Sequence, residues 1–470
     1  MRYLPNSDSD RAAMLKATGC SSVEEFFDRI PSELRLKGRL NLPGPLSEPE
    51  ILEFFRQAAR RSTREYVSLL GAGAYRHYVP VAVNALLSRG EFFTAYTPYQ
   101  AEIAQGTLQA MFEFQTLMTQ LTGMDVGNAS LYDGSTATAE AVLMAIRVTR
   151  RNRVLLARTV HPEYYQVLRT FIRHQGTEVQ QVPYEASGQL DLAGLESALN
   201  AETAALVVQS PNFFGTLERT AKIAEAVHRS GSLLIVTIAE PLSLALVKPP
   251  READIVCGEA QSFGVGVAFG GPYVGFLTAK EKFLRQMPGR LVGQTVDKEG
   301  RRGFVLTLAT REQHIRREKA TSNICTNQSL CALAVTIYLS LLGKNGLRRL
   351  AEQNLAKAHY VARQLAAIPG VATPFGGPHF NEFVVRTPRD AGELLADLQK
   401  QKIIGGFNLE RFYPELKNHL LVCVTETVSR EAIERTVEAF SRAVGSDHET
   451  ENAAAGVELV EAALRRPVAK

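Results

Sequence analysis

Two sets of apolar residues near the start of the chain recur at the spacing of a helix face, and Pro43-Gly44-Pro45 separates them. The first set is Phe26, Phe27 and Ile30, and the second is Ile51, Leu52, Phe54 and Phe55. Ser21 and Ser22 precede two glutamates, an order typical of a helix start, because serine caps and acidic residues favour the first turn. Residues 1–65 are therefore expected to form a helical N-terminal segment.

Between residues 66 and 325, short apolar runs alternate with stretches of helical periodicity. The predicted strands are residues 154–157, 179–182, 205–209, 233–236, 255–257 and 273–276. The predicted helices are residues 101–121, 139–147, 164–174, 192–199 and 221–228. Most of these strands are continuous apolar runs, which indicates burial on both faces. The alternation predicts a large α/β domain with a mostly parallel sheet.

The periodicity becomes mainly helical after residue 310. Helices are predicted at residues 327–342, 345–367, 391–400 and 430–444, and strands at residues 383–385 and 420–424. This order predicts long helices and a small C-terminal α+β domain over residues 326–445. Residues 446–470 are acidic, then alanine-rich, then basic, and are expected to form a loosely ordered tail.

Composition and charge narrow the class of protein. Hydrophobic residues make up 45% and charged residues 22% of the 470 residues, which are globular proportions rather than those of a disordered chain. The net charge of +4 is small for this length. Basic residues gather at 147–153 and 311–319, but such groups are typical of solvated helix faces and helix C-termini. Nucleic-acid binding is therefore not expected.

The five cysteines are scattered, and no Cys-x-x-Cys pair occurs. This spacing argues against zinc sites and a disulfide framework, so we expect no metal site and a reducing compartment. The start of the chain lacks the pattern of a signal peptide. No apolar run approaches the ~20 residues of a membrane span. These features together predict a soluble, cytoplasmic protein.

A large α/β domain followed by a smaller one is the layout of pyridoxal-phosphate-dependent transferases of the aspartate aminotransferase type (fold type I). Such enzymes hold the cofactor phosphate at a turn before a helix, because free N–H groups and the helix dipole favour an anion. Gly134, Ser135 and Thr136 stand where this turn is expected, although an ordinary capped helix start has the same composition. Glu240 follows a strand, where an acid would pair with the pyridine nitrogen. The alternative for Glu240 is a surface carboxylate.

The lysine that forms the Schiff base in this fold is missing from its expected place. After the strand at residues 255–257 the chain continues Gly258-Glu259-Ala260-Gln261-Ser262-Phe263-Gly264. Lys248 precedes this strand, and Lys280 and Lys282 follow the next one, so none of the three is well placed. The pocket is therefore expected to be vestigial, without a covalently bound cofactor.

Several sequence blocks resemble motifs of the P-proteins of the glycine cleavage system. They are Tyr96-Thr97-Pro98-Tyr99-Gln100-Ala101-Glu102-Ile103-Ala104-Gln105-Gly106, Leu131-Tyr132-Asp133-Gly134-Ser135-Thr136-Ala137, Ala253-Asp254-Ile255-Val256, Gln261-x-Phe263-Gly264, Gly270-Gly271-Pro272 and the stretch from Thr310 to Cys325. The resemblance extends over about residues 1–445, and long matches in several blocks make it highly specific. P-proteins are either one chain of two homologous halves or two separate subunits. This chain resembles the N-terminal half or first subunit, in which Asp is usual where Glu240 stands.

The resemblance implies that the second subunit carries the lysine and the pyridoxal phosphate, and that the first helps to build the active site across the interface. The enzyme would decarboxylate glycine and pass the aminomethyl group to the lipoyl arm of H-protein, as an oxidoreductase active only with both subunits. Two copies of each subunit and a functional link to the T- and L-proteins are also implied. The missing lysine agrees with this assignment.

On this chain the resemblance points to Tyr96, Tyr99 and Gln105 as residues that reach the shared site, where a tyrosine could orient the substrate or transfer a proton. A second group could hold a carboxylate, a phosphate or acidic residues of the partner. It consists of Arg311, His314, Arg317, Lys319 and Asn323. Packing at the interface is the alternative for the tyrosines, and a structural ion network is the alternative for the basic group.

Two other functions stay open at this point. The chain could be a non-catalytic scaffold that assembles its partner, although the tyrosine-rich block and the basic block argue against pure scaffolding. It could also be a self-contained pyridoxal-phosphate lyase or aminotransferase, against which the missing lysine argues. Cys325 is expected to be a free thiol.

Overall fold

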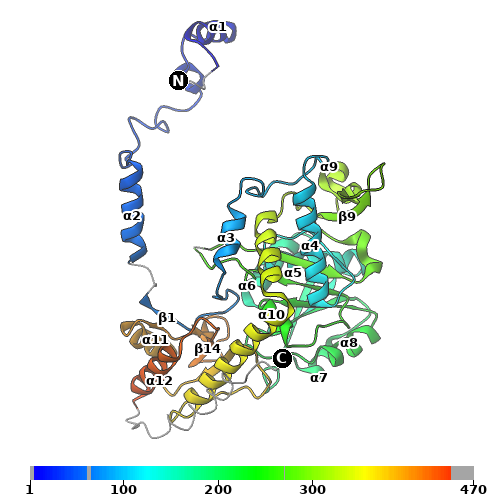
Figure 1. Ribbon diagram of the computed structural model, residues 1–470, viewed down its shortest axis with the longest axis vertical. Helices are drawn as coiled ribbons and strands as arrows, with labels where there is room; N and C mark the ends of the chain where they lie inside the picture. The colour runs from blue at the N-terminus through cyan, green and yellow to red at the C-terminus, as the bar shows by residue number, and fades with distance from the viewer. Residues whose placement is uncertain (1–4, 61–64, 269, 446–470) are drawn as a thin grey trace. The chain divides into compact units, whose positions relative to one another are not determined.

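The computed structural model describes residues 5–60, 65–268 and 270–445 (Figure 1). The chain divides into two compact units, Met1–Glu65 and Tyr66–Lys470. The predicted boundary between residues 325 and 326 stays a prediction, and the predicted tail at 446–470 lies outside the described residues.

The first unit contains helix α1 (Asp8–Thr18), the 3₁₀ helix η1 (Glu24–Phe27) and helix α2 (Glu48–Arg60). Ser7 caps the start of helix α1, and its hydroxyl accepts a hydrogen bond from Asp10 N in a capping box. No residue between 5 and 60 is buried, and the apolar side chains of α2 are exposed. The described part of this unit therefore has no core of its own.

Seven strands of the described part of the second unit form one sheet in the order β2-β8-β7-β6-β5-β3-β4. Their bounds are β2 (Val126–Gly127), β3 (Arg153–Ala157), β4 (Glu178–Val182), β5 (Thr203–Gln209), β6 (Leu233–Ile238), β7 (Ile255–Glu259) and β8 (Gly275–Ala279). Strands β4, β3, β5, β6 and β7 are parallel to one another, β8 is antiparallel to β7, and β2 is antiparallel to β8. Every residue of β5, β6 and β7 is buried, so both faces of the sheet are covered. The predicted mostly parallel α/β architecture is confirmed.

Helices pack around this sheet (Figure 1). They are α3 (Val81–Leu87), α4 (Gln105–Thr122), α5 (Gly134–Thr149), α6 (Pro162–Ile172), α7 (Leu192–Ala198) and α8 (Thr220–Arg229), with the 3₁₀ helices η3 (Pro241–Ala245) and η4 (Glu281–Gln286). Helix α5 lies against β5, β6, β7 and β8, and most of its residues are buried. Its N-terminus therefore meets the carboxyl ends of the parallel strands, where ligands bind in open α/β sheets.

Strands β9 (Leu291–Val296) and β10 (Arg302–Thr307) form an antiparallel hairpin that the sequence analysis did not predict. Only the first residues of β9 are buried, so no continuous apolar run marks this strand. Val292 and Phe304 pack against Leu108 and Met111 of α4. The chain then passes through η5 (Ala309–Arg311), α9 (Gln313–Arg316) and η6 (Arg317–Lys319).

Helix α10 (Ser329–Ala366) is interrupted by non-helical backbone at Gly343, in agreement with the break between the helices predicted at residues 327–342 and 345–367. By length and apolar composition alone, this helix could cross a membrane. Its residues Cys331, Val335 and Leu339 instead belong to the main hydrophobic core. Helix α10 therefore packs as a core helix alongside α4.

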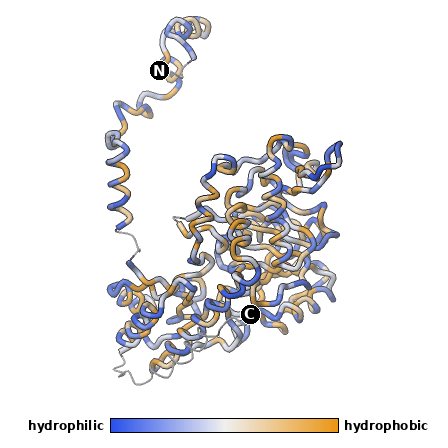
Figure 2. Tube along the Cα trace, viewed as in Figure 1, coloured by the Kyte–Doolittle hydropathy of each residue, from blue (hydrophilic) through white to orange (hydrophobic). Residues whose placement is uncertain are grey.

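The C-terminal part is a smaller α+β arrangement with its own apolar core. Its elements are β11 (Glu382–Arg386), α11 (Ala391–Lys400), β12 (Ile403–Ile404), β13 (Phe407–Asn408), η7 (Leu409–Arg411), β14 (His419–Cys423) and α12 (Arg430–Val444). Strands β11, β14 and β13 are antiparallel, and β1 (Val67–Ser68) pairs in parallel with β12. The chain after β1 thus runs from this part toward the large sheet. Figure 2 shows that hydrophobic segments gather along the central sheet.

Candidate functional site

The predicted phosphate turn begins helix α5, and two of its amide groups, Gly134 N and Thr136 N, already have partners within the chain. Asp133 is the N-cap, and its Oδ1 accepts hydrogen bonds from Thr136 N at 2.7 Å and Ser135 Oγ at 2.6 Å. Gly134 N donates to Glu259 Oε2 at 2.9 Å. The local sequence forms this turn because Asp is a strong N-cap and the Asp133 amide donates in return to Thr136 Oγ1 at 3.1 Å.

Glu259 ends strand β7 and is buried. Its second oxygen, Oε1, accepts hydrogen bonds from Gln261 N at 3.0 Å and Val274 N at 2.9 Å. Burial raises the pKa of this carboxyl to about 7, and the three backbone N–H donors limit the rise. Glu259 thus connects β7, the segment before β8 and the start of α5.

Gln261 lies in the segment after β7, where a lysine would be required. Its Oε1 accepts a hydrogen bond from Tyr75 N at 3.1 Å, and its Nε2 donates to Tyr75 O at 3.2 Å and to Val265 O. The side chain is buried. Gln261 therefore holds the extended segment around Tyr75 and has no free polar atom.

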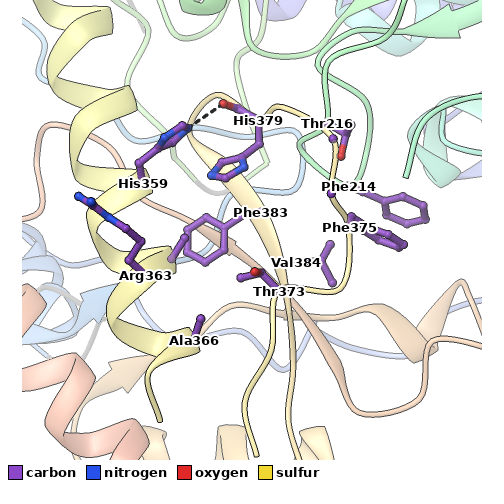
Figure 3. A pocket seen from close by; sticks show the side chains of 13 residues that line it. Phe214, Thr216, His359, Arg363, Ala366, Thr373, Phe375, His379, Phe383 and Val384 are labelled. Atoms are coloured by element: carbon purple, nitrogen blue, oxygen red, sulfur yellow. Dashed lines mark hydrogen bonds between the residues drawn. The ribbon is translucent and has the colours of Figure 1, made fainter. Parts of the chain in front are cut away.

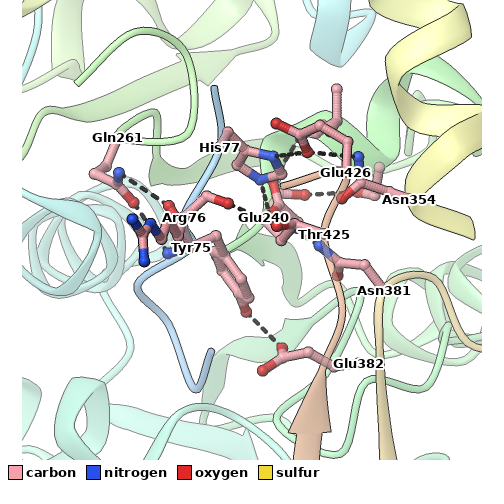
Figure 4. A network of polar contacts seen from close by, with 12 residues as sticks. Tyr75, Arg76, His77, Glu240, Gln261, Asn354, Asn381, Glu382, Thr425 and Glu426 are labelled. Atoms are coloured by element: carbon pink, nitrogen blue, oxygen red, sulfur yellow. Dashed lines mark hydrogen bonds and ion pairs between the residues drawn. The ribbon is translucent and has the colours of Figure 1, made fainter. Parts of the chain in front are cut away.

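Glu240 follows β6 and is 1% exposed, so the alternative of a surface carboxylate is wrong. Its Oε2 is 2.9 Å from His77 Nε2 and accepts from Asn381 Nδ2 at 3.1 Å (Figure 4). His77 Nδ1 is 2.8 Å from Glu426 Oε2. Burial opposes a charged imidazole, but the two carboxylates outweigh it and raise the pKa of His77 to about 10.

A neighbouring part of the same network joins the segment before His77 to the small C-terminal part (Figure 4). Tyr75 Oη donates to Glu382 Oε2 at 2.6 Å, and Ala72 N donates to Glu382 Oε1 at 2.7 Å. Burial raises the pKa of Glu382 to about 7, against the two hydrogen bonds. Two buried groups, His77 and Glu382, therefore connect the segment around residue 75 to β11 and to the end of β14.

These residues do not fit a resident pyridoxal phosphate on this chain. The segment after β7 contains Gln261 and no lysine, Gly134 N is bonded to Glu259, and Glu240 is paired with His77. Lys280 Nζ donates to Arg251 O, and Lys282 Nζ is 3.6 Å from Asp254 Oδ1. Both lysines therefore lie near the start of β7, at the opposite end of this strand from Glu259. Lys248 also precedes β7, and it is exposed.

Tyr96 and Tyr99 form an exposed aromatic pair, with ring centroids 6.0 Å apart in an edge-to-face arrangement. Arg290 lies beneath them: its guanidinium is 4.8 Å from the centre of the Tyr99 ring, and its Nη2 donates to Tyr99 Oη at 2.6 Å. Partial burial raises the pKa of the Tyr99 hydroxyl, while Arg290 opposes the rise. The arginine thus fixes the position of Tyr99 from below.

Arg290 is in turn held by an ion pair with Glu312, and both side chains are buried. His314 approaches from the same side, with Nδ1 3.6 Å from Glu312 Oε2 and its ring 6.3 Å from that of Tyr99. We call Tyr96, Tyr99, Arg290, Glu312 and His314 the tyrosine–arginine cluster. The sequence analysis missed Arg290 and Glu312, although Glu312 lies inside the block from Thr310 to Cys325.

The side chain of Gln105 bonds to residues outside this cluster. Its Oε1 accepts from Phe304 N at 2.8 Å, and its Nε2 donates to Phe304 O at 2.9 Å and to Ala101 O at 2.7 Å. The amide thus pairs with β10 as another strand would and holds the β9–β10 hairpin on α4. Its predicted place in a shared site stays a prediction.

Arg311 also bonds within the chain. Its guanidinium donates to the carbonyl groups of Met287, Gly289 and Leu308. Burial lowers the pKa of Arg311 to about 10, and the charge of Arg147 acts in the same direction. These bonds fix the turn that carries Arg290 into the tyrosine–arginine cluster.

The other residues of the predicted anion-binding group are exposed. Arg317, Lys319 and Asn323 make no side-chain hydrogen bond or ion pair with any described residue. Arg317 has a positive φ of 52°, which few residues other than glycine adopt. Ser322 Oγ accepts a hydrogen bond from Ile324 N at 3.1 Å. The segment therefore presents unpaired cationic groups near His314.

A separate hollow of about 480 Å³ lies between the end of α10 and strand β11 (Figure 3). His359 and His379 lie on its wall with ring centroids 4.3 Å apart. Burial, together with His359, lowers the pKa of His379 to about 4, so this ring is neutral at physiological pH. None of the predicted site residues belongs to the lining of this hollow.

Comparison with known proteins gives consistent matches over nearly the whole chain. The family model described as "Glycine cleavage system P-protein" matches residues 1–440. The chain is 54% identical over 443 residues to "Probable glycine dehydrogenase (decarboxylating) subunit 1" of Koribacter versatilis (strain Ellin345), covering 94% of this chain and 100% of that protein. It is 55% identical over 441 residues to the protein of the same name from Solibacter usitatus (strain Ellin6076), covering 93% and 97%.

Solved structures agree with the fold. A crystal structure of glycine decarboxylase (P-protein) of the glycine cleavage system, in inhibitor-bound form, is similar with a TM-score of 0.84 at 43% identity, covering 94% of this chain and 100% of that chain. A sphingosine-1-phosphate lyase of Burkholderia pseudomallei K96243 has a TM-score of 0.64 at 17% identity, covering 92% and 98%. A glutamate decarboxylase of Lactobacillus brevis has a TM-score of 0.67 at 12% identity, covering 90% and 99%. The predicted fold type I class is confirmed.

Proposed function

The chain belongs to the P-protein family of the glycine cleavage system, and from this premise we propose that it is the first of two subunits that together decarboxylate glycine. The relatives named subunit 1 imply a second subunit. We assign the covalently bound pyridoxal phosphate to that second subunit. The observation that supports this assignment is the occupied pocket of this chain: the segment after β7 has no lysine, Gln261 in that segment bonds to Tyr75, and Glu259 bonds to the turn of α5.

The tyrosine–arginine cluster is the part of this chain that we assign to the shared site. Arg290 Nη2 donates to the oxygen of Tyr99, which leaves the Tyr99 hydroxyl hydrogen to be donated, either to the Cys325 thiol within the chain or to a bound ligand. Such a hydroxyl can donate to the carboxylate of bound glycine, and Tyr96 lies beside it to cover the substrate from water. Pyridoxal phosphate, bound by the second subunit, supplies the electron sink for the loss of CO2.

The exposed basic segment supports a second role for this chain. His314, Arg317, Lys319 and Asn323 lie close together in the sequence, and no described residue neutralises Arg317 or Lys319. Unpaired cations attract carboxylates and acidic surfaces. We assign this segment to contacts with acidic residues of the second subunit or with an anionic group at the entrance of the site.

The remaining steps follow the family. We propose that the aminomethyl group passes to the lipoyl arm of H-protein, that two copies of each subunit assemble, and that the T- and L-proteins act on the later steps. We propose a cytoplasmic location, since the chain has the fold of soluble enzymes.

Separate purification of this chain and of the second subunit tests the proposal. Each is mixed with pyridoxal phosphate, treated with borohydride and examined by absorption spectroscopy and mass spectrometry. We expect a reduced covalent adduct on the second subunit alone, and glycine-dependent release of CO2 only after mixing. A stable adduct on this chain alone, with glycine turnover, would contradict the proposal and favour a self-contained enzyme.

A further inference from the structure

The N-terminus of α5 is bonded to a carboxylate that the protein itself supplies. Gly134 N donates to Glu259 Oε2 at 2.9 Å, and Glu259 comes from the carboxyl end of the neighbouring strand β7. The first-turn N–H groups of a helix and its dipole attract anions, and phosphate groups commonly bind there. In this chain the group at that place is a carboxyl side chain that cannot dissociate, and with a pKa of about 7 it is mostly ionised at about pH 8.

The space around Gly134 supports the same conclusion independently. A Cβ added to Gly134 would lie 2.3 Å from Tyr164 Oη and 2.9 Å from Glu259 N. The helix start is therefore in direct contact with β7 and with the Tyr164 side chain. No gap of the size of a phosphate separates the turn from Glu259.

The opposite end of the expected pocket is occupied in a similar way. Glu240, the acid after β6, is paired with the buried imidazole of His77 at 2.9 Å. A pyridinium nitrogen would make the same charge-assisted hydrogen bond with an acid at this place. Between these ends, Gln261 bonds to the backbone of Tyr75.

We propose that Glu259 is a built-in substitute for the cofactor phosphate, and that with His77 on Glu240 it closes this pocket to pyridoxal phosphate. The inference deepens the proposed function, because it rests on the assignment of the cofactor to the second subunit. It also predicts a latent anion site: removal of the Glu259 carboxylate exposes the N–H groups of Gly134, Gln261 and Val274 to an added anion.

Thermal unfolding of the full-length Glu259→Ala variant tests this inference. Midpoints are measured at about pH 8 with increasing inorganic phosphate or acetate, and chloride keeps the ionic strength constant. We expect a lower midpoint than in the wild type in chloride, and a saturable rise in phosphate or acetate. The wild type should respond to the three anions equally, because its anion site is already filled.

Glu382→Ala is the matched control. It also removes a buried carboxylate that accepts a backbone N–H, but no helix begins there. We expect it to lower the midpoint without a response specific to phosphate. An equal response of both variants, or no anion response of Glu259→Ala, would overturn the inference.

If Glu259→Ala does not fold in chloride, its folding is measured in phosphate and in acetate. Recovery of folded chain in phosphate or acetate, but not in chloride, would support the inference.

Glu259→Gln is the second variant. Its side chain fills the space but turns an amide NH2 toward backbone N–H donors, so we expect a reduced midpoint and no anion response. A wild-type midpoint for Glu259→Gln would overturn the inference. These measurements use this chain alone, so their failure is distinct from a loss of glycine turnover in the two-subunit enzyme.

Discussion

Arg290 and Glu312 form an ion pair in which the two side chains are only 2% and 7% exposed. Arg290 precedes β9, and Glu312 precedes α9. The same guanidinium donates to Tyr99 Oη, so the pair links the tyrosine block to the basic block. The position of Tyr99 therefore depends on two charges that are distant from it in the sequence.

Removal of one partner of this pair should destabilise the protein. An uncompensated buried charge costs on the order of 3–5 kcal/mol, so Glu312→Ala should lower the free energy of unfolding by about that amount. Urea unfolding of the full-length chain measures the change. The double variant Arg290→Met, Glu312→Leu should recover much of the stability, because apolar residues often replace a buried pair at little cost. It should not recover glycine turnover, because Tyr99 has lost its donor; full activity in the double variant would argue against a positioning role of Arg290.

Removal of the Tyr99 hydroxyl should reduce turnover while the two-subunit complex stays intact. Tyr99→Phe keeps the ring beside Arg290 and His314 but loses the hydroxyl donor. A hydrogen bond to a charged group contributes roughly 1.5–3 kcal/mol, which corresponds to about a 10- to 100-fold loss of kcat/KM for glycine.

Tyr360→Phe is the control for this measurement, because Tyr360 is partly buried in the small C-terminal core. Gel filtration with the second subunit reports assembly. Unchanged turnover of both Tyr96→Phe and Tyr99→Phe in an intact complex would favour the scaffold function instead.

His77 should make stability fall with rising pH in the alkaline range. Its pKa is raised from 6.5 to about 10 in the folded chain by Glu240 and Glu426, against the effect of burial. The stabilisation is fully present below about pH 6.5 and is lost as the pH rises through about 10. Since tyrosines and lysines also titrate there, the quantity to measure is the difference in unfolding free energy between wild type and His77→Gln. We expect this difference to shrink by a few kcal/mol between about pH 6.5 and 10; a constant difference would mean that His77 is neutral.

Glu382 should make the stability of the folded chain fall as the pH rises through the acidic range. Burial raises its pKa from 4.5 to about 7, so its protonated form is favoured in the folded chain. The corresponding stabilisation is present below about pH 4.5 and is lost as the pH rises through about 7. Glu382→Gln cannot ionise; its amide oxygen can accept from Ala72 N, and its NH2 group can donate to Tyr75 Oη. Relative to the wild type, we expect this variant to gain stability between about pH 4.5 and 7, as measured by urea unfolding at intervals across that range.

Local patterns were sufficient for most of the secondary structure. Strands such as β5 and β6 are continuous apolar runs, and α12 has a strong apolar face. Both patterns involve residues that are close in the sequence, so they can be recognised without the tertiary structure. The interruption at Gly343 follows from the same local reasoning. The hairpin of β9 and β10 was missed because most of β9 is exposed and carries no apolar period.

The site depended on contacts between residues far apart in the chain. Glu240 has the same local sequence whether it is exposed or buried, and its burial follows from His77 and Asn381, which lie 163 and 141 residues away. Arg290 meets Tyr99 across 191 residues, and Gln105 meets Phe304 across 199 residues. The absence of a lysine after β7 could be read directly from the residues present. That Glu259 bonds to the start of α5 could not, because the strand and the helix must first pack side by side before the carboxylate reaches the amide.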